Sequence, residues 1–276
     1  MSALPTFKEP RPTLLVIDRS FPGEADLGTA VSAALMQRVA RGEIGETIRL
    51  HRTDPVLVFG RLDKLRPGYG RAVAIAREHG YEPVLRLGGG HAAAFHEGTV
   101  SLSRASRHPG TSGASGSYGG TRGRFEEMAA TVTTALRALG IDARTGEVPG
   151  EYCPGEFSVN ARGEVKLAGI GQRVISGGAH TGCVIVVHGG GRIRAVLEPV
   201  YEALELDWDP RTAGSVAGEL DEEDLPGPDG PYRLIERTVA AIREVLSQSF
   251  ELHDSELDDE TRQLAAELRS DHAMTI

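Results

Sequence analysis

Short apolar runs alternate along the chain with longer segments in which hydrophobic residues recur every three or four positions. From Leu27 to Val39, leucine and valine alternate at four-residue steps, which predicts an amphipathic helix over residues 25–41. Residues 13–17 instead form a continuous apolar run of the length of a buried strand. These two patterns, with abundant glycine and few aromatic residues, predict a loop-rich α/β enzyme rather than a helical bundle.

The same patterns predict the remaining elements. Further strands are expected at 47–52, 55–59, 82–87, 99–103, 156–160 and 164–170, and further helices at 68–79, 125–139, 232–249 and 259–269. A second strand pair, 183–188 with 192–196, is expected to be joined by a hairpin loop at the glycines 189–191.

Two segments differ from the rest in composition. Residues 106–123 are rich in glycine and serine and nearly devoid of apolar residues, which predicts a loop that could close over a ligand. Past residue 205 the chain becomes acidic. We therefore predict a catalytic domain over residues 1–205 and an acidic helical extension over residues 206–276.

Charge and cysteine content exclude several classes of protein. The net charge of −9 argues against nucleic-acid or anionic-membrane partners, because both require clustered positive charge. No apolar run approaches the roughly 18 residues of a membrane span, and the N-terminal residues lack the apolar segment of a secretory signal. With only two cysteines a disulfide framework is not expected, so the predicted location is the cytoplasm.

The candidate functional residues lie in two basic segments that are interrupted by glycines. The first begins at Arg86 and continues through the three glycines 88–90; the second begins at Lys166 and ends at Arg173. Glycines let backbone N–H groups approach an anion closely, because no Cβ intervenes. Two such segments suit a site that grips an activated carboxylate, either an acyl-adenylate or an acyl-thioester.

Each feature also has a simpler explanation. The glycines fit the dinucleotide pattern G-x-G-x-x-A, but no acidic residue follows about 20 positions later. A tight turn without a ligand is another alternative. Strict alternation would place Lys166 on one face of its strand with Ala168 and Ile170, where a buried ammonium needs a carboxylate or phosphate partner.

The two cysteines differ in their predicted surroundings. Cys153 lies beside Pro154 in a predicted loop, whereas Cys183 lies within an apolar strand and is expected in the core. A nearby lysine would favour the thiolate that a nucleophilic cysteine needs. No zinc site is expected from the cysteines and histidines, because the ligand spacing is missing.

Taken together, these motifs resemble the biotin/lipoate protein ligase and octanoyltransferase superfamily, in particular its lipoate–protein ligase A-like branch. The resemblance runs from about residue 14 to residue 200. It is carried, in order, by the helix 28–39 with strand 48–52, Val58-Phe59-Gly60-Arg61, Arg86 with the triple glycine, Phe95-His96-Glu97-Gly98, the segment 166–173, and His180-Thr181-Gly182.

The resemblance implies an α+β fold with a mixed β-sheet flanked by helices, a short helical C-terminal tail and an acyl group buried across the sheet. It implies that Lys166 is catalytic, as a clamp on developing oxyanion charge. Cys153 matches in position the acyl-accepting nucleophile of one octanoyltransferase group. The implied substrate- or adenylate-binding residues are Arg86, Gly88, Gly89, Gly90, His91, His96, Gly169, Gly171, Gln172, Arg173, His180 and Gly182.

The sequence departs from the family pattern at four places. Two extra residues separate the glycines from His96, and one is missing after Glu97. Leu62 and Asp63 stand where the family has a glutamine. The family's Asn-Asp pair before the lysine has no counterpart, and the segment 153–156 occupies that region instead.

Three functions remain open from the sequence. As a lipoate–protein ligase, the main expectation, the chain would use ATP and Mg²⁺ to activate lipoate or octanoate and join it to a lysine of a lipoyl-carrier protein. As an octanoyltransferase, it would use Cys153 to accept octanoyl from an acyl-carrier protein, without ATP. As a non-catalytic protein, it would only bind lipoyl or biotinyl groups. Biotin ligation is disfavoured, since the Gly-Arg-Gly-Arg loop of biotin ligases is replaced by Arg-Leu-Gly-Gly-Gly.

Overall fold

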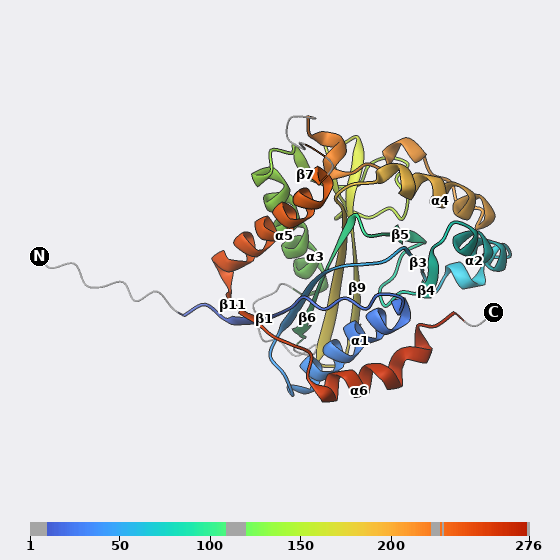
Figure 1. Ribbon diagram of the computed structural model, residues 1–276. Helices are drawn as coiled ribbons and strands as arrows, with labels where there is room; N and C mark the ends of the chain where they lie inside the picture. The colour runs from blue at the N-terminus through green and yellow to red at the C-terminus, as the bar shows by residue number, and fades with distance from the viewer. Residues whose placement is uncertain (1–9, 109–119, 222–226, 228, 275–276) are drawn as a thin grey trace, which may run out of the picture.

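The α+β architecture expected from the sequence is present in the computed structural model, which describes residues 10–108, 120–221, 227 and 229–274. A large mixed sheet crosses the molecule, with helices on both faces and a smaller sheet at one side (Figure 1). The expectation of a mixed sheet flanked by helices is confirmed.

Within the described residues, the large sheet has eight strands. Their spatial order is β11 (Glu251–Asp254), β1 (Thr13–Ile17), β2 (Thr47–Arg52), β6 (Thr99–Arg107), β10 (Gly178–Val186), β9 (Val165–Ile175), β8 (Val159–Ala161) and β7 (Ala143–Thr145). Strand β1 pairs in parallel with β11 and β2, and the other neighbours are antiparallel.

The small sheet has three strands in the order β4 (Glu82–Leu85), β3 (Val56–Phe59) and β5 (Ala93–Phe95). Helices α2 (Tyr69–Glu78) and α4 (Gly190–Ala203) share an apolar core with it, which includes Phe59, Val73 and Leu197. Figure 1 shows these elements gathered at one side of the large sheet.

The remaining helices cover the two faces of the large sheet. Helices α3 (Gly120–Ala138) and α5 (Gly230–Ser249) pack on one face, where Leu102, Leu136 and Ile242 share a core. Helix α1 (Ala25–Arg41) packs on the other face, with α6 (Asp259–Leu268) against it. Short 3-10 turns occur at Asp63–Leu65, Pro210–Thr212, Val216–Glu219 and Arg269–Asp271.

Alternation along the central strands gives the middle of the large sheet one apolar and one mostly polar face. In β2 and β6, Ile48 and Leu102 enter the core beneath α3 and α5. The intervening residues, Arg49 in β2 and Ser103 in β6, pair directly across the strands and therefore share the opposite face. That polar face is turned toward α1 and the small sheet.

One predicted element was wrong in type. Residues 192–196 belong to helix α4, not to a strand, and Gly189 precedes its first turn with a φ of +78° instead of closing a hairpin. The buried side chains of Ile193, Leu197 and Val200 recur at helical spacing. Residues 192–196 alone span little more than one helical turn, so this period is visible only over the full length of α4.

Other elements were longer or were missed. Strand β6 continues to Arg107, α3 begins at Gly120, and β5, β7 and β11 were not predicted. The predicted closing loop lies mostly in residues 109–119, outside the described residues. The boundary near residue 205 stays a prediction, although the residues beyond it supply β11 to the large sheet.

Candidate active site

A cavity of about 500 Å³ lies between the polar face of the large sheet, the small sheet and the segment 152–158. Most of the residues singled out in the sequence line it. They are Arg86, Gly88, Gly89, Gly90, Cys153, Lys166, Gly169, Gly171, Gln172, His180 and Gly182. The two basic segments, about 80 residues apart in the chain, thus meet at one site.

The loop that contains the glycines 88–90, called the glycine loop below, leaves the small sheet at the end of β4 and approaches β9 closely. A Cβ on Gly88 would stand 3.2 Å from the backbone nitrogen of Gln172. Gly90 has a φ of +99°, and a Cβ there would stand 2.7 Å from both the Cys153 sulfur and Nη2 of Arg86. Only glycine fits at position 90 without displacing these two side chains.

Lys166 reaches the cavity because of a bulge in β9. Asn160 pairs with Lys166 but Val159 pairs with Ala168, so Leu167 is an extra residue in the strand. Both Leu167 and Ala168 enter the core, whereas Lys166 turns toward Gly169, whose Cβ position lies 3.3 Å from the lysine Cε. The strict alternation assumed from the sequence was therefore wrong at this point.

The buried ammonium of Lys166 has a partner that sequence reasoning missed. Its Nζ lies 3.1 Å from Oε1 of Glu151 and donates to the carbonyl oxygens of Tyr152 at 2.9 Å and Cys153 at 2.8 Å. Both charged side chains are almost fully buried. The nitrogen also lies 4.8 Å from the centroid of the Tyr152 ring.

Glu151 organises the whole segment that carries Cys153. Its carboxylate also accepts hydrogen bonds from the backbone N–H groups of Val148 and Gly155, at 3.2 and 3.1 Å, and from the Ser158 hydroxyl at 2.5 Å. A carboxylate with this many donors fixes the loop around itself. In the sequence, the feature that could have indicated this role of Glu151 is an acidic residue two positions before a loop cysteine.

Cys153 sits at the turn of this segment with its sulfur toward the glycine loop. Its φ of +44° is left-handed, which is uncommon for a residue other than glycine. The backbone N–H donates to the Tyr201 hydroxyl at 2.8 Å, and that hydroxyl donates to the Ala92 carbonyl at 2.9 Å. Nη1 of Arg86 lies 3.6 Å from Sγ. A positive charge beside the sulfur stabilises negative charge on it.

Three predicted binding residues do not line the cavity. His91 is held by Asp63, with 2.8 Å between Nδ1 and Oδ1. His96 is fully buried near His188, and Arg173 is exposed on β9. His91 and His96 are positioned by residues distant in the sequence, Asp63 and His188, and Arg173 lies farther along β9 than the cavity-lining residues Gly169 and Gly171. The motifs do not reveal these relations.

Other cavity residues were missed. The stacked rings of Phe125 and Phe157, 5.3 Å apart, form an apolar wall, and Ser101 and Ser103 belong to the polar face of β6. His180 was predicted, and burial lowers its pKa to about 4, so its ring is neutral near neutral pH. Cys183 is buried in the core, as expected, although it also contributes to the lining of the cavity.

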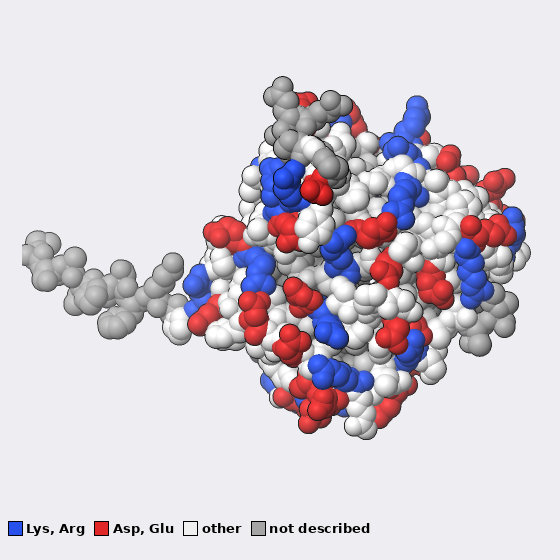
Figure 2. Space-filling model, in the orientation of Figure 1, with Lys and Arg blue, Asp and Glu red and all other residues white. Residues whose placement is uncertain are grey.

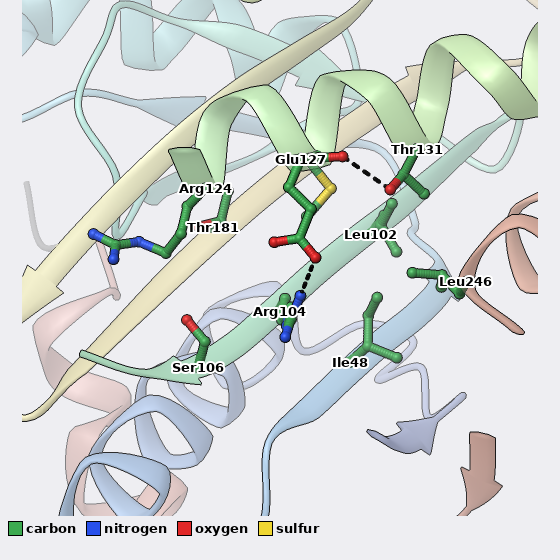
Figure 3. Close-up of a pocket in the computed structure, with 10 residues that line it drawn as sticks. Ile48, Leu102, Arg104, Ser106, Arg124, Glu127, Thr131, Thr181 and Leu246 are labelled. Atoms are coloured by element: carbon green, nitrogen blue, oxygen red, sulfur yellow. Dashed lines mark hydrogen bonds and ion pairs between the residues drawn. The ribbon is translucent and has the colours of Figure 1, made fainter. Parts of the chain in front are cut away.

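A much smaller cavity lies on that far face, between α3 and the sheet (Figure 3). It measures about 20 Å³, and Glu127 of α3 points across it to Arg104 of β6, 2.6 Å from Oε1 to Nη1. Such a volume holds no more than a water molecule. We therefore take this cavity as a packing feature of the α3 contact.

Comparison with known proteins identifies the family. Residues 26–254 match the sequence profile described as the lipoyl protein ligase A/B catalytic domain. The chain belongs to this family. The resemblance inferred from the motifs is thereby confirmed.

Relatives within the family carry enzyme names. The chain is 30% identical to an octanoyl-[GcvH]:protein N-octanoyltransferase of Anoxybacillus flavithermus over 86% of its length and 78% of the relative's. It is also 30% identical to the enzyme of the same name from Geobacillus kaustophilus, over 68% of its length and 65% of the relative's. The expectation of an enzyme rather than a non-catalytic binder is confirmed by this family membership.

Solved structures share the fold. A lipoate-protein ligase A bound with ATP matches with a TM-score of 0.65 and 20% identity, covering 94% of both chains. A bipartite lipoate protein ligase of Thermoplasma acidophilum matches with a TM-score of 0.64 and 18% identity, covering 95% of this chain and 93% of the other. At these identities the likeness concerns the fold alone.

The described residues contain neither a cluster of metal-ligating side chains nor a helix suited to a membrane. No group of three or more His, Cys, Asp or Glu side chains in that part of the chain is arranged to hold a metal ion. No helix within it has the length and apolar character needed to cross a membrane.

Proposed function

We propose that this protein is an ATP-independent acyltransferase that moves an octanoyl-type group from a carrier protein to a lysine of another protein, with Cys153 as the nucleophile. The observation that carries the proposal is the position of Cys153. Its sulfur lies in the cavity beside Arg86, on a segment held by the Lys166–Glu151 pair. The relatives' names, which specify octanoyl-GcvH as donor, support this alternative more strongly than the ligase expectation.

The acyl transfer proceeds in two steps. The Cys153 sulfur attacks the octanoyl carbonyl carbon and a C–S bond forms. The bond from that carbon to the donor's nitrogen or sulfur breaks, and the thiol proton passes to that atom as it leaves. The amine of the acceptor lysine then attacks the thioester carbonyl. The C–S bond breaks, the amide forms, and the sulfur recovers a proton from the amine.

Arg86 and the glycine loop are placed to assist both steps. Arg86 lies next to the sulfur, and the loop brings backbone groups close to β9. Donors fixed in advance around a reacting carbonyl stabilise the negative charge that develops on its oxygen. Lys166 positions the segment that carries Cys153, because its ammonium donates hydrogen bonds to the backbone carbonyl groups of Tyr152 and Cys153.

The residues expected to grip an adenylate fit that role poorly. The Lys166 ammonium is buried against Glu151 and two carbonyl groups, and Arg173 does not line the cavity. A lysine already neutralised by a carboxylate has little charge to offer a phosphate. This arrangement favours a thioester over an acyl-adenylate.

A transfer assay with three donors tests the proposal. An apo lipoyl-carrier domain is incubated with the protein and either octanoyl-GcvH, octanoyl-acyl-carrier protein, or octanoate with Mg-ATP, and its intact mass is followed. We expect octanoylation from octanoyl-GcvH without ATP, abolished in Cys153→Ala and retained in Cys183→Ala, the matched cysteine that is buried in the core.

Other outcomes distinguish the alternatives. Modification only from octanoate with Mg-ATP, unchanged by Cys153→Ala, would establish a ligase and reject the thioester route. Modification only from the acyl-carrier protein would keep Cys153 chemistry but change the donor.

A further inference from the structure

Two exposed leucines lie on the turn that joins β3 to α2. Leu62 is 66% exposed and Leu65 is 80% exposed, more than any other large apolar residue in the described chain. The Leu65 N–H donates to the Leu62 carbonyl at 3.1 Å, and residues three apart in such a 3-10 turn point to the same side. A single exposed leucine needs no explanation, but two that point the same way form an apolar surface patch.

Positive charge flanks these two leucines. Arg61 and Lys64 are exposed, and no ion pair within the described residues joins either of them to a carboxylate. Asp63, the acidic residue of the turn, is fully buried and faces inward, where it accepts from the Gly60 N–H at 2.8 Å and lies 2.8 Å from Nδ1 of His91. In a chain of net charge −9, the turn therefore presents an apolar patch between two cations.

Close backbone contacts connect this turn to the candidate nucleophile. The turn follows Gly60, where a Cβ would collide with the carbonyl oxygen of Gly90. Gly90 in turn lies against Cys153, because its own Cβ position is 2.7 Å from the sulfur. Gly89 and Gly90 are exposed as well as lining the cavity, so the glycine loop forms part of the cavity rim. The two leucines thus stand beside the entrance to Cys153.

The proposed reaction requires a docking surface at this entrance. Donor and acceptor are both proteins that have to bring a lysine side chain to Cys153, so each of them must contact the rim of the cavity. Neither Leu62 nor Leu65 lines the cavity, so a small substrate gains nothing from them. A protein interface instead places apolar residues at its centre and charged residues at its rim, and opposite charge on the partner speeds their association.

We propose that the carrier proteins that exchange the acyl group with Cys153 dock on one surface, called the leucine turn below. Its residues are Arg61, Leu62, Lys64 and Leu65. The partner that this surface fits is a carrier domain that presents carboxylates and an apolar contact near its modified lysine. The inference rests on the proposed transfer through Cys153, and it names the surface that recognises the protein substrates.

A comparison of a protein donor with a small donor tests the inference. Acylation of Cys153 is measured at increasing concentrations of octanoyl-GcvH and of the N-acetylcysteamine thioester of octanoic acid, which has no protein part. With the thioester, the Cys153 sulfur attacks the octanoyl carbonyl carbon and displaces the N-acetylcysteamine thiol, which leaves with the proton. The variants are Leu62→Ser combined with Leu65→Ser, Lys64→Glu, and the control Tyr232→Ser, which alters an exposed aromatic residue of α5.

We expect the double leucine variant to raise KM for octanoyl-GcvH at least about tenfold, because the apolar centre of an interface contributes most of its affinity. Lys64→Glu should raise KM by roughly threefold at low ionic strength and by less at high ionic strength, since salt screens exposed charges. Both variants should react with the small thioester within about twofold of the rate of the unaltered protein, because the cavity is intact. Tyr232→Ser should leave the reaction with both donors unchanged.

Three results would overturn the inference. An unchanged KM for octanoyl-GcvH in the double leucine variant would exclude docking at the leucine turn. Equal losses with both donors would show that the leucines support the glycine loop instead of binding a partner. A change from dimer to monomer in the double variant, measured by analytical ultracentrifugation and without an effect on KM, would assign the patch to a contact between copies of this chain.

A binding measurement separates this inference from the proposed function. The fluorescence anisotropy of dye-labelled apo-GcvH is followed as the Cys153→Ala protein is added, with and without the leucine substitutions. Binding that is lost with the leucine substitutions and kept with Tyr232→Ser supports the docking surface even if Cys153 is never acylated. Acylation by the small thioester, with apo-GcvH binding unaffected by the leucine substitutions, keeps the transferase and rejects the surface. No detectable binding of apo-GcvH to the protein with an intact leucine turn also rejects it.

Discussion

At the scale of single residues, the site depends on contacts that no local pattern contains. Lys166 was correctly singled out as buried and in need of an anionic partner. The partner is Glu151, which lies in a loop whose conformation the sequence did not predict. The burial of Arg49 was not predicted, because a β-strand arginine is usually solvent-exposed, whereas here it is 1% exposed.

The Lys166–Glu151 pair yields the first prediction. Glu151→Gln leaves a buried ammonium without its counter-charge, and we expect it to lower the free energy of unfolding by about 3 kcal/mol. Adding Lys166→Met to this variant should recover part of the loss, because the uncompensated charge is then absent. Urea unfolding of the two single variants and the double variant gives the coupling. Additive effects would contradict a direct interaction.

His96 yields a prediction about pH. Burial, together with the charge of Arg192, lowers the pKa of His96 from 6.5 to about 4. The neutral ring is the stable form in the fold, so its contribution is complete above pH 6.5 and is lost as the pH falls toward 4. The shift corresponds to roughly 3 kcal/mol.

His96→Asn should flatten the pH dependence of unfolding between pH 6.5 and 4, because the amide oxygen can replace Nδ1 as acceptor for the Gly98 N–H. His253→Asn, at an exposed position of β11, serves as the control. If both variants keep the slope of the unaltered protein, another group causes the acid sensitivity.

At the scale of elements, hydrophobic period was a good guide wherever a segment was long and one-sided. The bounds of α1 and β2 were predicted residue for residue. Short elements such as β5 and β7 were missed, since three residues carry no readable period. The bulge in β9 could not be predicted, because it depends on pairing with β8 and yet decides where Lys166 points.

The glycine loop yields a prediction with a built-in control. Gly90→Ala places a Cβ 2.7 Å from the Cys153 sulfur at a φ of +99°, whereas Gly89→Ala meets no atom within 4 Å. We expect Gly90→Ala to cost about 1–3 kcal/mol in stability and most of the acylation rate of Cys153. Gly89→Ala should cost less than about 0.5 kcal/mol. Equal losses in the two variants would contradict the tight contact at position 90.

At the scale of the whole molecule, the first and last strands of the described chain pair in one sheet. Strand β11 pairs with β1, and α6 packs on α1 (Figure 1). On the face shown in Figure 2, acidic and basic side chains are interspersed over the described surface instead of forming one basic area. The sequence predicted the charge balance but could not predict the β1–β11 pairing, which joins residues more than 230 positions apart.

Truncation tests whether residues 1–205 fold independently of the residues that follow them. A chain that ends at residue 205 loses α5, β11 and α6, and so exposes the apolar side chains of Leu14 and Leu102 that these elements help to cover. We expect it to lack a cooperative unfolding transition, measured by circular dichroism during thermal unfolding. A sharp transition with the mean residue ellipticity of a folded α+β protein would instead support an independent domain over residues 1–205.

The most direct measurement for the central claim is the mass of the protein after exposure to octanoyl-GcvH with no acceptor present. The account predicts one octanoyl group on the peptide that contains Cys153, released by hydroxylamine as a thioester and passed to an acceptor lysine when a lipoyl domain is added. Octanoylation of the acceptor by Cys153→Ala at the rate of the unaltered protein would contradict it.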